Sequence, residues 1–180
     1  MKRKILLTSF QTWMPHHKSN SSDDLLMEIA KLDLSHELIY LRQLPVDVQL
    51  ASSSAIAKIN EVQPDAIICC GMAESRTTLT VESNASCGQE VIKTSLDLGQ
   101  LVGGLTGTGI SHDAGKFVCE GLYYQVLKYL REQQKNCPCI FVHVPILTPD
   151  NLAESVADFL LIIQHMLTRQ ESYSSSHTDL

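Results

Sequence analysis

Length, composition and charge exclude several classes of protein. The chain has 180 residues, of which 44% are hydrophobic and 19% are charged, as in an ordinary globular domain. A chain of this length buries about two-thirds of its unfolded surface, so the fold needs neither a structural metal nor a disulfide. The formal charge of -6, without a basic stripe, argues against nucleic acid or an anionic membrane as partner.

The cysteines and the two ends of the chain predict a cytoplasmic protein. The apolar run after the basic N-terminus spans only residues 5–7, far short of a signal peptide. No segment approaches the ~18 apolar residues of a membrane span. The six cysteines show no secretory context and are expected to be reduced. One domain is predicted over residues 1–168, followed by a polar, disordered tail at 169–180.

Strand and helix patterns alternate at both ends of the chain. Short apolar runs predict buried strands, and apolar residues at helical spacing predict helices. The predicted elements in chain order are a strand at 4–9, a helix after the candidate caps Asn20, Ser21 and Ser22, a strand at 38–41, a helix at 47–62, a strand at 66–70, hairpin strands and loops over 77–109, a helix at 115–134, a strand at 140–144, and a helix introduced by Thr148 and Pro149. This order predicts a three-layer α/β/α sandwich around a mostly parallel, twisted sheet.

Cys119 and His143 are the first candidates for chemistry. Cys119 falls in the opening turn of a predicted helix, where free N–H groups and the helix dipole lower a thiol pKa and can hold an oxyanion. It also lies on the apolar stripe of that helix, so a core position is the alternative. His143 ends the next apolar strand, and the carboxyl ends of parallel strands lie where the following helices begin. The pair fits a nucleophile and its base, although each residue alone is more often structural.

Other patterns carry less chemistry by themselves. Glu82 is a solvated charge unless a histidine needs orienting through its second ring nitrogen. Cys137 and Cys139, with His143 nearby, lack a fourth ligand at a recognisable zinc spacing. The glycine-containing stretch that starts at residue 109 does not complete a phosphate-binding loop.

Five segments carry a resemblance to one enzyme family. They are KILLTSF at 4–10, PDAIICCG at 64–71, RTTLTVE at 76–82, AGKFVC at 114–119 and FVHVP at 141–145. In this order they resemble the pyroglutamyl peptidases, also called pyrrolidone-carboxylate peptidases, over most of residues 3–165. The resemblance implies a cysteine omega-peptidase that releases N-terminal pyroglutamyl groups from peptides through a thioester, with no metal and no cofactor.

The resemblance also assigns roles to individual residues. Cys119 would attack, His143 would shuttle the proton, and Glu82 would orient His143. In this family an aromatic pocket holds the lactam ring, and backbone groups read its amide. Phe10 and Trp13 match the aromatic residues here, and the rest of the pocket would be lined by Gly71, Met72, Phe117 and Val118. The expected partner is a peptide or a small amide substrate, and a homo-oligomer is compatible with the family.

Departures from the family pattern leave the substrate open. Met14 and Pro15 replace two glycines of the aromatic turn, and Ile92 stands where the family has an arginine near the oxyanion. His16 and His17 follow in the same loop, where exposure or a position at the rim of the site is expected. Two alternatives therefore stay open: a thiol amidohydrolase for a different small acyl group, and a non-catalytic relative that binds a peptide or partner.

Overall fold

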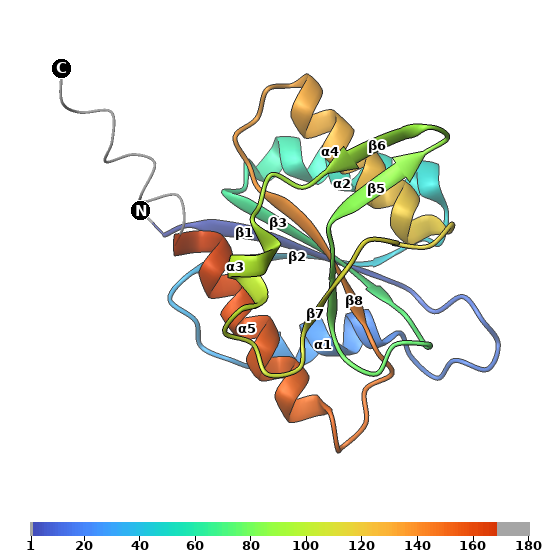
Figure 1. The fold of residues 1–180 in the computed structure, drawn as a ribbon, viewed down its shortest axis with the longest axis vertical. Coiled ribbons are helices and arrows are strands. Elements are labelled where there is room, and N and C mark those ends of the chain that lie inside the picture. The colour runs from blue at the N-terminus through green and yellow to red at the C-terminus, as the bar shows by residue number, and fades with distance from the viewer. Residues whose placement is uncertain (1, 169–180) are drawn as a thin grey trace.

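A computed structural model describes residues 2–168 of the chain, so the predicted tail at 169–180 lies outside the described residues. Figure 1 shows a central sheet with helices on both faces. The six strands of this sheet follow the order β2-β1-β3-β8-β4-β7. Their bounds are β1 Lys4–Phe10, β2 Glu37–Leu44, β3 Ala66–Met72, β4 Thr80–Glu82, β7 Gly109–Ser111 and β8 Cys139–Val144.

The first four strands of that order are parallel. β4 then runs antiparallel to β8, and β7 runs parallel to β4. Two further strands form a separate antiparallel hairpin, β5 (Asn84–Cys87) with β6 (Glu90–Lys93). The helices are α1 Ser21–Ala30, α2 Val48–Val62, α3 Leu98–Val102, α4 Val118–Glu132 and α5 Leu152–Thr168.

The sheet separates two apolar cores. Along β1, Ile5 and Leu7 point into the core beneath α1 and α5, whereas Leu6 points into the core beneath α2 and α4. The continuous apolar runs arise because both faces of the sheet are covered (Figure 1). The predicted three-layer α/β/α fold with a mostly parallel sheet is confirmed. Within residues 2–168 the helices are all too short or too polar to span a bilayer.

Two predictions about helices need correction. The helix introduced by Thr148 begins only at Leu152, because a turn precedes it: the Asn151 side chain accepts a hydrogen bond from the Thr148 N–H at 2.8 Å. The short α3 lies in the stretch that was expected to hold only strands and loops. Asp97 caps it through a hydrogen bond from the Gln100 N–H. A helix of five residues is too short to produce a recognisable helical pattern.

Candidate active site

His143 and Glu82 meet on the sheet face that α2 and α4 cover. His143 of β8 lies opposite Thr80 of β4, so Glu82, two residues further, projects from the same face. His143 Nδ1 lies 2.7 Å from Glu82 Oε1, and both side chains are buried. With Glu82 ionised, Nδ1 donates this hydrogen bond, and Nε2 remains able to accept a proton.

Arg76 and Tyr123 hold Glu82 in this position. Arg76 Nη2 lies 3.5 Å from Glu82 Oε1 and donates a hydrogen bond to Ser111 Oγ at 3.0 Å. The Tyr123 hydroxyl donates to the backbone carbonyl of Glu82 at 3.1 Å. Side chain and backbone of the glutamate are therefore both fixed, and so is the imidazole ring that it contacts. The sequence offered no specific indication of this role for Arg76.

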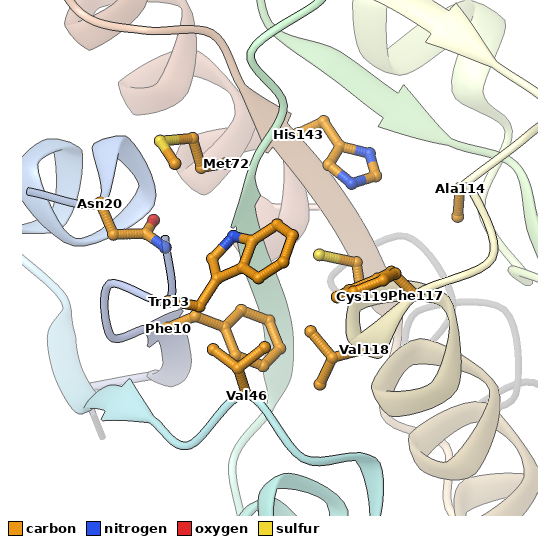
Figure 2. Close-up of a pocket in the computed structure, with 10 residues that line it drawn as sticks. All are labelled: Phe10, Trp13, Asn20, Val46, Met72, Ala114, Phe117, Val118, Cys119 and His143. Atoms are coloured by element: carbon orange, nitrogen blue, oxygen red, sulfur yellow. The ribbon is translucent and has the colours of Figure 1, made fainter. Parts of the chain in front are cut away.

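Cys119 is the second residue of α4, and its sulfur packs against Gly71. An ideal Cβ on Gly71 would lie 2.6 Å from Cys119 Sγ, so the sulfur occupies the space of a side chain at that position. Gly71 pairs with His143 across β3 and β8, and paired residues project from the same face. The sulfur therefore lies beside the His143 ring, and Figure 2 shows both side chains at one pocket.

Burial controls the protonation of the Cys119 thiol. Phe117 caps α4 without a side-chain hydrogen bond, so free N–H groups do surround the start of the helix. Nevertheless, burial raises the pKa of Cys119 to about 12, the Glu82 carboxylate adds to the rise, and a hydrogen bond from the residue's own N–H opposes it. The prediction of a lowered pKa is therefore wrong for the resting site. The thiol is protonated, and a base must remove its proton before it can attack.

A pocket of about 140 Å³ opens in front of Cys119 and His143. The residues that line it are Phe10, Trp13, Asn20, Val46, Met72, Ala114, Phe117, Val118, Cys119 and His143 (Figure 2). Five of the six residues predicted to bind substrate are among them, whereas Gly71 lies behind the cysteine sulfur. The exposed rings of Trp13 and Phe117 form part of the rim, with centroids 4.8 Å apart. Their roles in binding stay a prediction.

Three residues that line the pocket are not predicted by the sequence patterns: Asn20, Val46 and Ala114. The sequence predicts Asn20 as a helix cap, and it does cap α1 by accepting a hydrogen bond from the Ser22 N–H. Val46 comes just after the carboxyl end of β2, and residues after such strand ends are expected at the ligand-binding edge of a parallel sheet. That rule could have identified Val46.

The position of the family arginine does not face the pocket. Ile92 lies in β6 opposite Ala85, is 7% exposed, and belongs to the core beneath α2 and α4. None of the residues that line the described pocket is an arginine. The zinc alternative at Cys137 and Cys139 gains no support either, since neither belongs to a cluster of three ligands among residues 2–168.

Comparison with curated proteins finds pyrrolidone-carboxylate peptidases. The protein of that name from Thermoanaerobacter sp. strain X514 is 29% identical over 170 aligned positions, which cover 80% of this chain and 83% of that protein. Pyrrolidone-carboxylate peptidase 1 of Caldanaerobacter subterraneus subsp. tengcongensis is 28% identical over 177 positions, which cover 84% of this chain and 86% of that protein. No protein-family profile matches the chain.

Comparison with solved structures finds the same fold. The pyroglutamyl peptidase I from Bacillus amyloliquefaciens superposes with a TM-score of 0.79 at 20% identity, covering 93% of this chain and 96% of that one. The pyrrolidone carboxyl peptidase from Thermococcus litoralis gives a TM-score of 0.82 at 19% identity, covering 94% and 96%. The chain is thus similar in sequence to the pyrrolidone-carboxylate peptidases, a family of cysteine peptidases, and it shares their fold.

Proposed function

We propose that this chain is a cysteine omega-peptidase that removes N-terminal pyroglutamyl groups from peptides, with Cys119 as nucleophile, His143 as base and Glu82 as orienting acid. One observation carries the proposal. The buried hydrogen bond of 2.7 Å between His143 Nδ1 and Glu82 Oε1 lies beside the thiol of Cys119, at a pocket with a largely apolar lining. A thiol, an imidazole and a carboxylate grouped at one pocket support acyl transfer with these three roles.

The reaction begins with transfer of the Cys119 proton to His143 Nε2. The thiolate attacks the carbonyl carbon that joins the pyroglutamyl group to the next residue, which gives a tetrahedral oxyanion. His143 then returns the proton to the leaving amine, the C–N bond breaks, and a thioester remains. A water molecule, deprotonated by His143, attacks the thioester and releases pyroglutamate and the free thiol.

Backbone groups at the start of α4 are the donors we assign to the oxyanion. The N–H groups in the first turn have no helical partner, and Phe117 offers no side-chain cap. The N–H of Cys119 already lies close enough to its own sulfur to lower the thiol pKa. Preorganised donors of this kind stabilise charge that develops in the transition state. Because Ile92 is buried in the core, these amides stabilise the oxyanion without an arginine from that position.

The pocket walls suit a small, uncharged ring. Phe10, Val118 and the rim aromatics supply apolar contacts to the lactam. Met72 is tied to α1, since its sulfur accepts a hydrogen bond from the Ser21 N–H at 3.5 Å, so its side chain does not read the lactam amide. The Asn20 amide donates one hydrogen to the Gln11 carbonyl at 3.1 Å. Its second hydrogen remains for the lactam oxygen.

The test is release of a fluorescent amine from pyroglutamyl, prolyl and acetyl amides. We expect cleavage of the pyroglutamyl amide that is lost in Cys119→Ala and kept in Cys87→Ala, which removes an exposed cysteine outside the pocket. Cleavage of only another acyl amide would shift the proposal to a thiol amidohydrolase of different specificity. A folded protein that cleaves none of the three would contradict the proposal and favour a binding role.

A further inference from the structure

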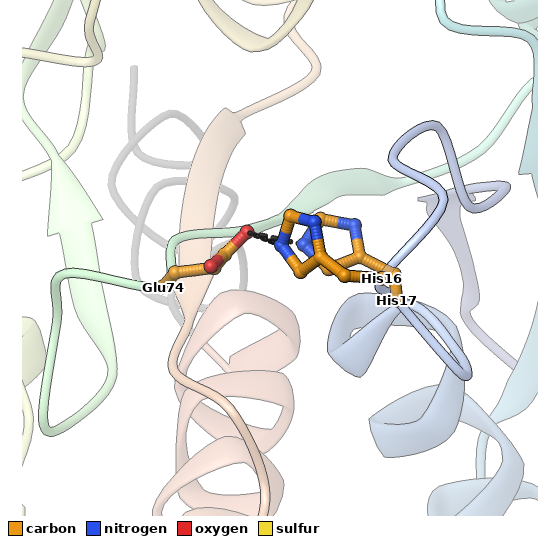
Figure 3. Close-up of side chains that lie close together, drawn as sticks. All are labelled: His16, His17 and Glu74. Atoms are coloured by element: carbon orange, nitrogen blue, oxygen red, sulfur yellow. Dashed lines mark hydrogen bonds and ion pairs between the residues drawn. The ribbon is translucent and has the colours of Figure 1, made fainter.

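Two histidines and a glutamate gather at the rim of the pocket. His16 and His17 lie in the loop between β1 and α1, and Glu74 lies just after β3 (Figure 3). His17 Nε2 hydrogen-bonds Glu74 Oε1, and His16 Nε2 lies 3.5 Å from the same oxygen. One ligand atom from each residue lies within 4.8 Å of the others, and no other such group occurs in the described part of the chain.

The state of each side chain in this cluster suits metal coordination. Both histidines direct Nε2 at one oxygen of the Glu74 carboxylate, so the three donor atoms converge. The His17 side chain is only 5% exposed, and its Nδ1 is buried without a hydrogen-bond partner among the described residues. His16 and Glu74 are 60% and 45% exposed, which leaves the cluster open to solvent on one side. An ion can therefore approach the Glu74 oxygen and the two Nε2 atoms from the side of His16 and Glu74.

We propose that His16, His17 and Glu74 bind a divalent transition-metal ion of the zinc class. Two imidazoles and one carboxylate are a donor set that zinc uses, with a water molecule in the fourth position. Magnesium and calcium prefer all-oxygen ligands, so they fit this set poorly. A zinc-class ion holds such donors at about 2.0–2.2 Å, and the three donor atoms already lie within 4.8 Å of one another.

The ion would join two segments that both line the pocket. His17 contacts Trp13 edge-on with ring centroids 6.2 Å apart, and Trp13 packs on Phe117 at the rim. Glu74 lies two residues beyond Met72 of the pocket wall. Coordination therefore fixes the Trp13 loop against the end of β3. This role is separate from the proposed cleavage reaction and does not depend on it.

Trp13 provides the readout, because it is the single tryptophan of the chain. Co²⁺ is titrated into the Cys119→Ala variant, which removes the pocket thiol as a competing ligand, while Trp13 fluorescence is recorded. We expect saturable quenching at one equivalent, reversed by Zn²⁺. His16→Ala and Glu74→Gln should each weaken Co²⁺ binding by at least about tenfold. Loss of a residue that only hydrogen-bonds a metal ligand already lowers metal affinity by about 10–100-fold. His36→Ala, which removes a histidine before β2, should leave the curve unchanged.

Two results would overturn the proposal. One is quenching that rises without saturation. The other is a saturating curve that His16→Ala and Glu74→Gln leave in place, which would assign the ion to other ligands. His16 is largely exposed, so its replacement should not unfold the chain. The test therefore remains decisive even if replacement of the buried His17 unfolds the protein.

Discussion

Replacement of Gly71 by alanine tests whether the cysteine sulfur must sit against β3. The added Cβ would lie 2.6 Å from Cys119 Sγ and 2.8 Å from Phe141 Cζ. Ordinary contacts between such atoms are about 3.5–4.0 Å, so the sulfur must move by about 1 Å or more. Phe141 is fully buried and cannot move aside freely. The thiol is therefore displaced from its place beside His143.

The expected effect has two parts. A displacement of about 1 Å at a reacting group costs about 10²-fold in rate. Gly71 is not among the residues that line the pocket, so the loss should fall on kcat, with KM nearly unchanged. Overpacking of this kind costs about 1–3 kcal/mol, which lowers Tm by roughly 2–12 °C in a domain of this size.

The assay is hydrolysis of a pyroglutamyl amide, with thermal unfolding measured on the same samples. Gly104→Ala is the matched control, because no atom lies within 4 Å of an ideal Cβ there. It should keep both activity and Tm. Full activity and unchanged Tm in Gly71→Ala would refute the placement of Cys119 Sγ. A lowered Tm with unchanged kcat would refute the link between that placement and catalysis.

Three further predictions address the triad and its surroundings. Glu82→Gln keeps the shape of the buried side chain but removes the carboxylate that orients His143, so kcat should fall by about 10⁴, as for the same change in another triad, with little change in Tm. A large loss of Tm with kcat retained would give Glu82 a structural role instead. Because the pKa of Cys119 is raised to about 12, the fraction of thiolate should grow about tenfold per pH unit. Alkylation of Cys119 by iodoacetamide, measured by mass spectrometry, should therefore become steadily faster above pH 7. A rate that levels off near neutral pH would instead indicate a resting thiolate. Ile92→Arg should lower Tm without raising kcat, since it places an unpaired charge in the core. A gain in kcat would show that a side chain at this position does reach the oxyanion.

Much of the fold was predictable because its core strands are apolar on both faces. β1, β3 and β8 stand out as short, mostly apolar runs, and the alternation of strands and helices at both ends of the chain favours a mostly parallel sheet. The rule that ligands bind at the carboxyl ends of such strands brings Cys119 and His143 to one edge. The structure has them there, although their catalytic roles stay a prediction.

What the sequence could not supply depends on distant contacts. The bond from Arg76 to Glu82 joins two segments whose local patterns say nothing of each other. Distant contacts also explain why the pKa of Cys119 is raised, whereas the sequence predicts a lowered pKa. A helix start is visible in sequence, but burial of the sulfur against Gly71 and its proximity to a carboxylate appear only after folding. Local reasoning weighs the first effect and misses the two larger ones.

The raised pKa of Cys119 also constrains how the proposed triad can work. The Glu82 carboxylate disfavours a negative sulfur, and no arginine lines the described pocket to offset it. A standing thiolate–imidazolium pair is therefore disfavoured before substrate binds. Proton transfer to His143 must instead wait until substrate is bound and come just before attack, after which charge passes from sulfur to the substrate oxygen at the start of α4. In such a site Glu82 favours catalysis by stabilising the imidazolium that forms, while it suppresses reactivity of the resting thiol.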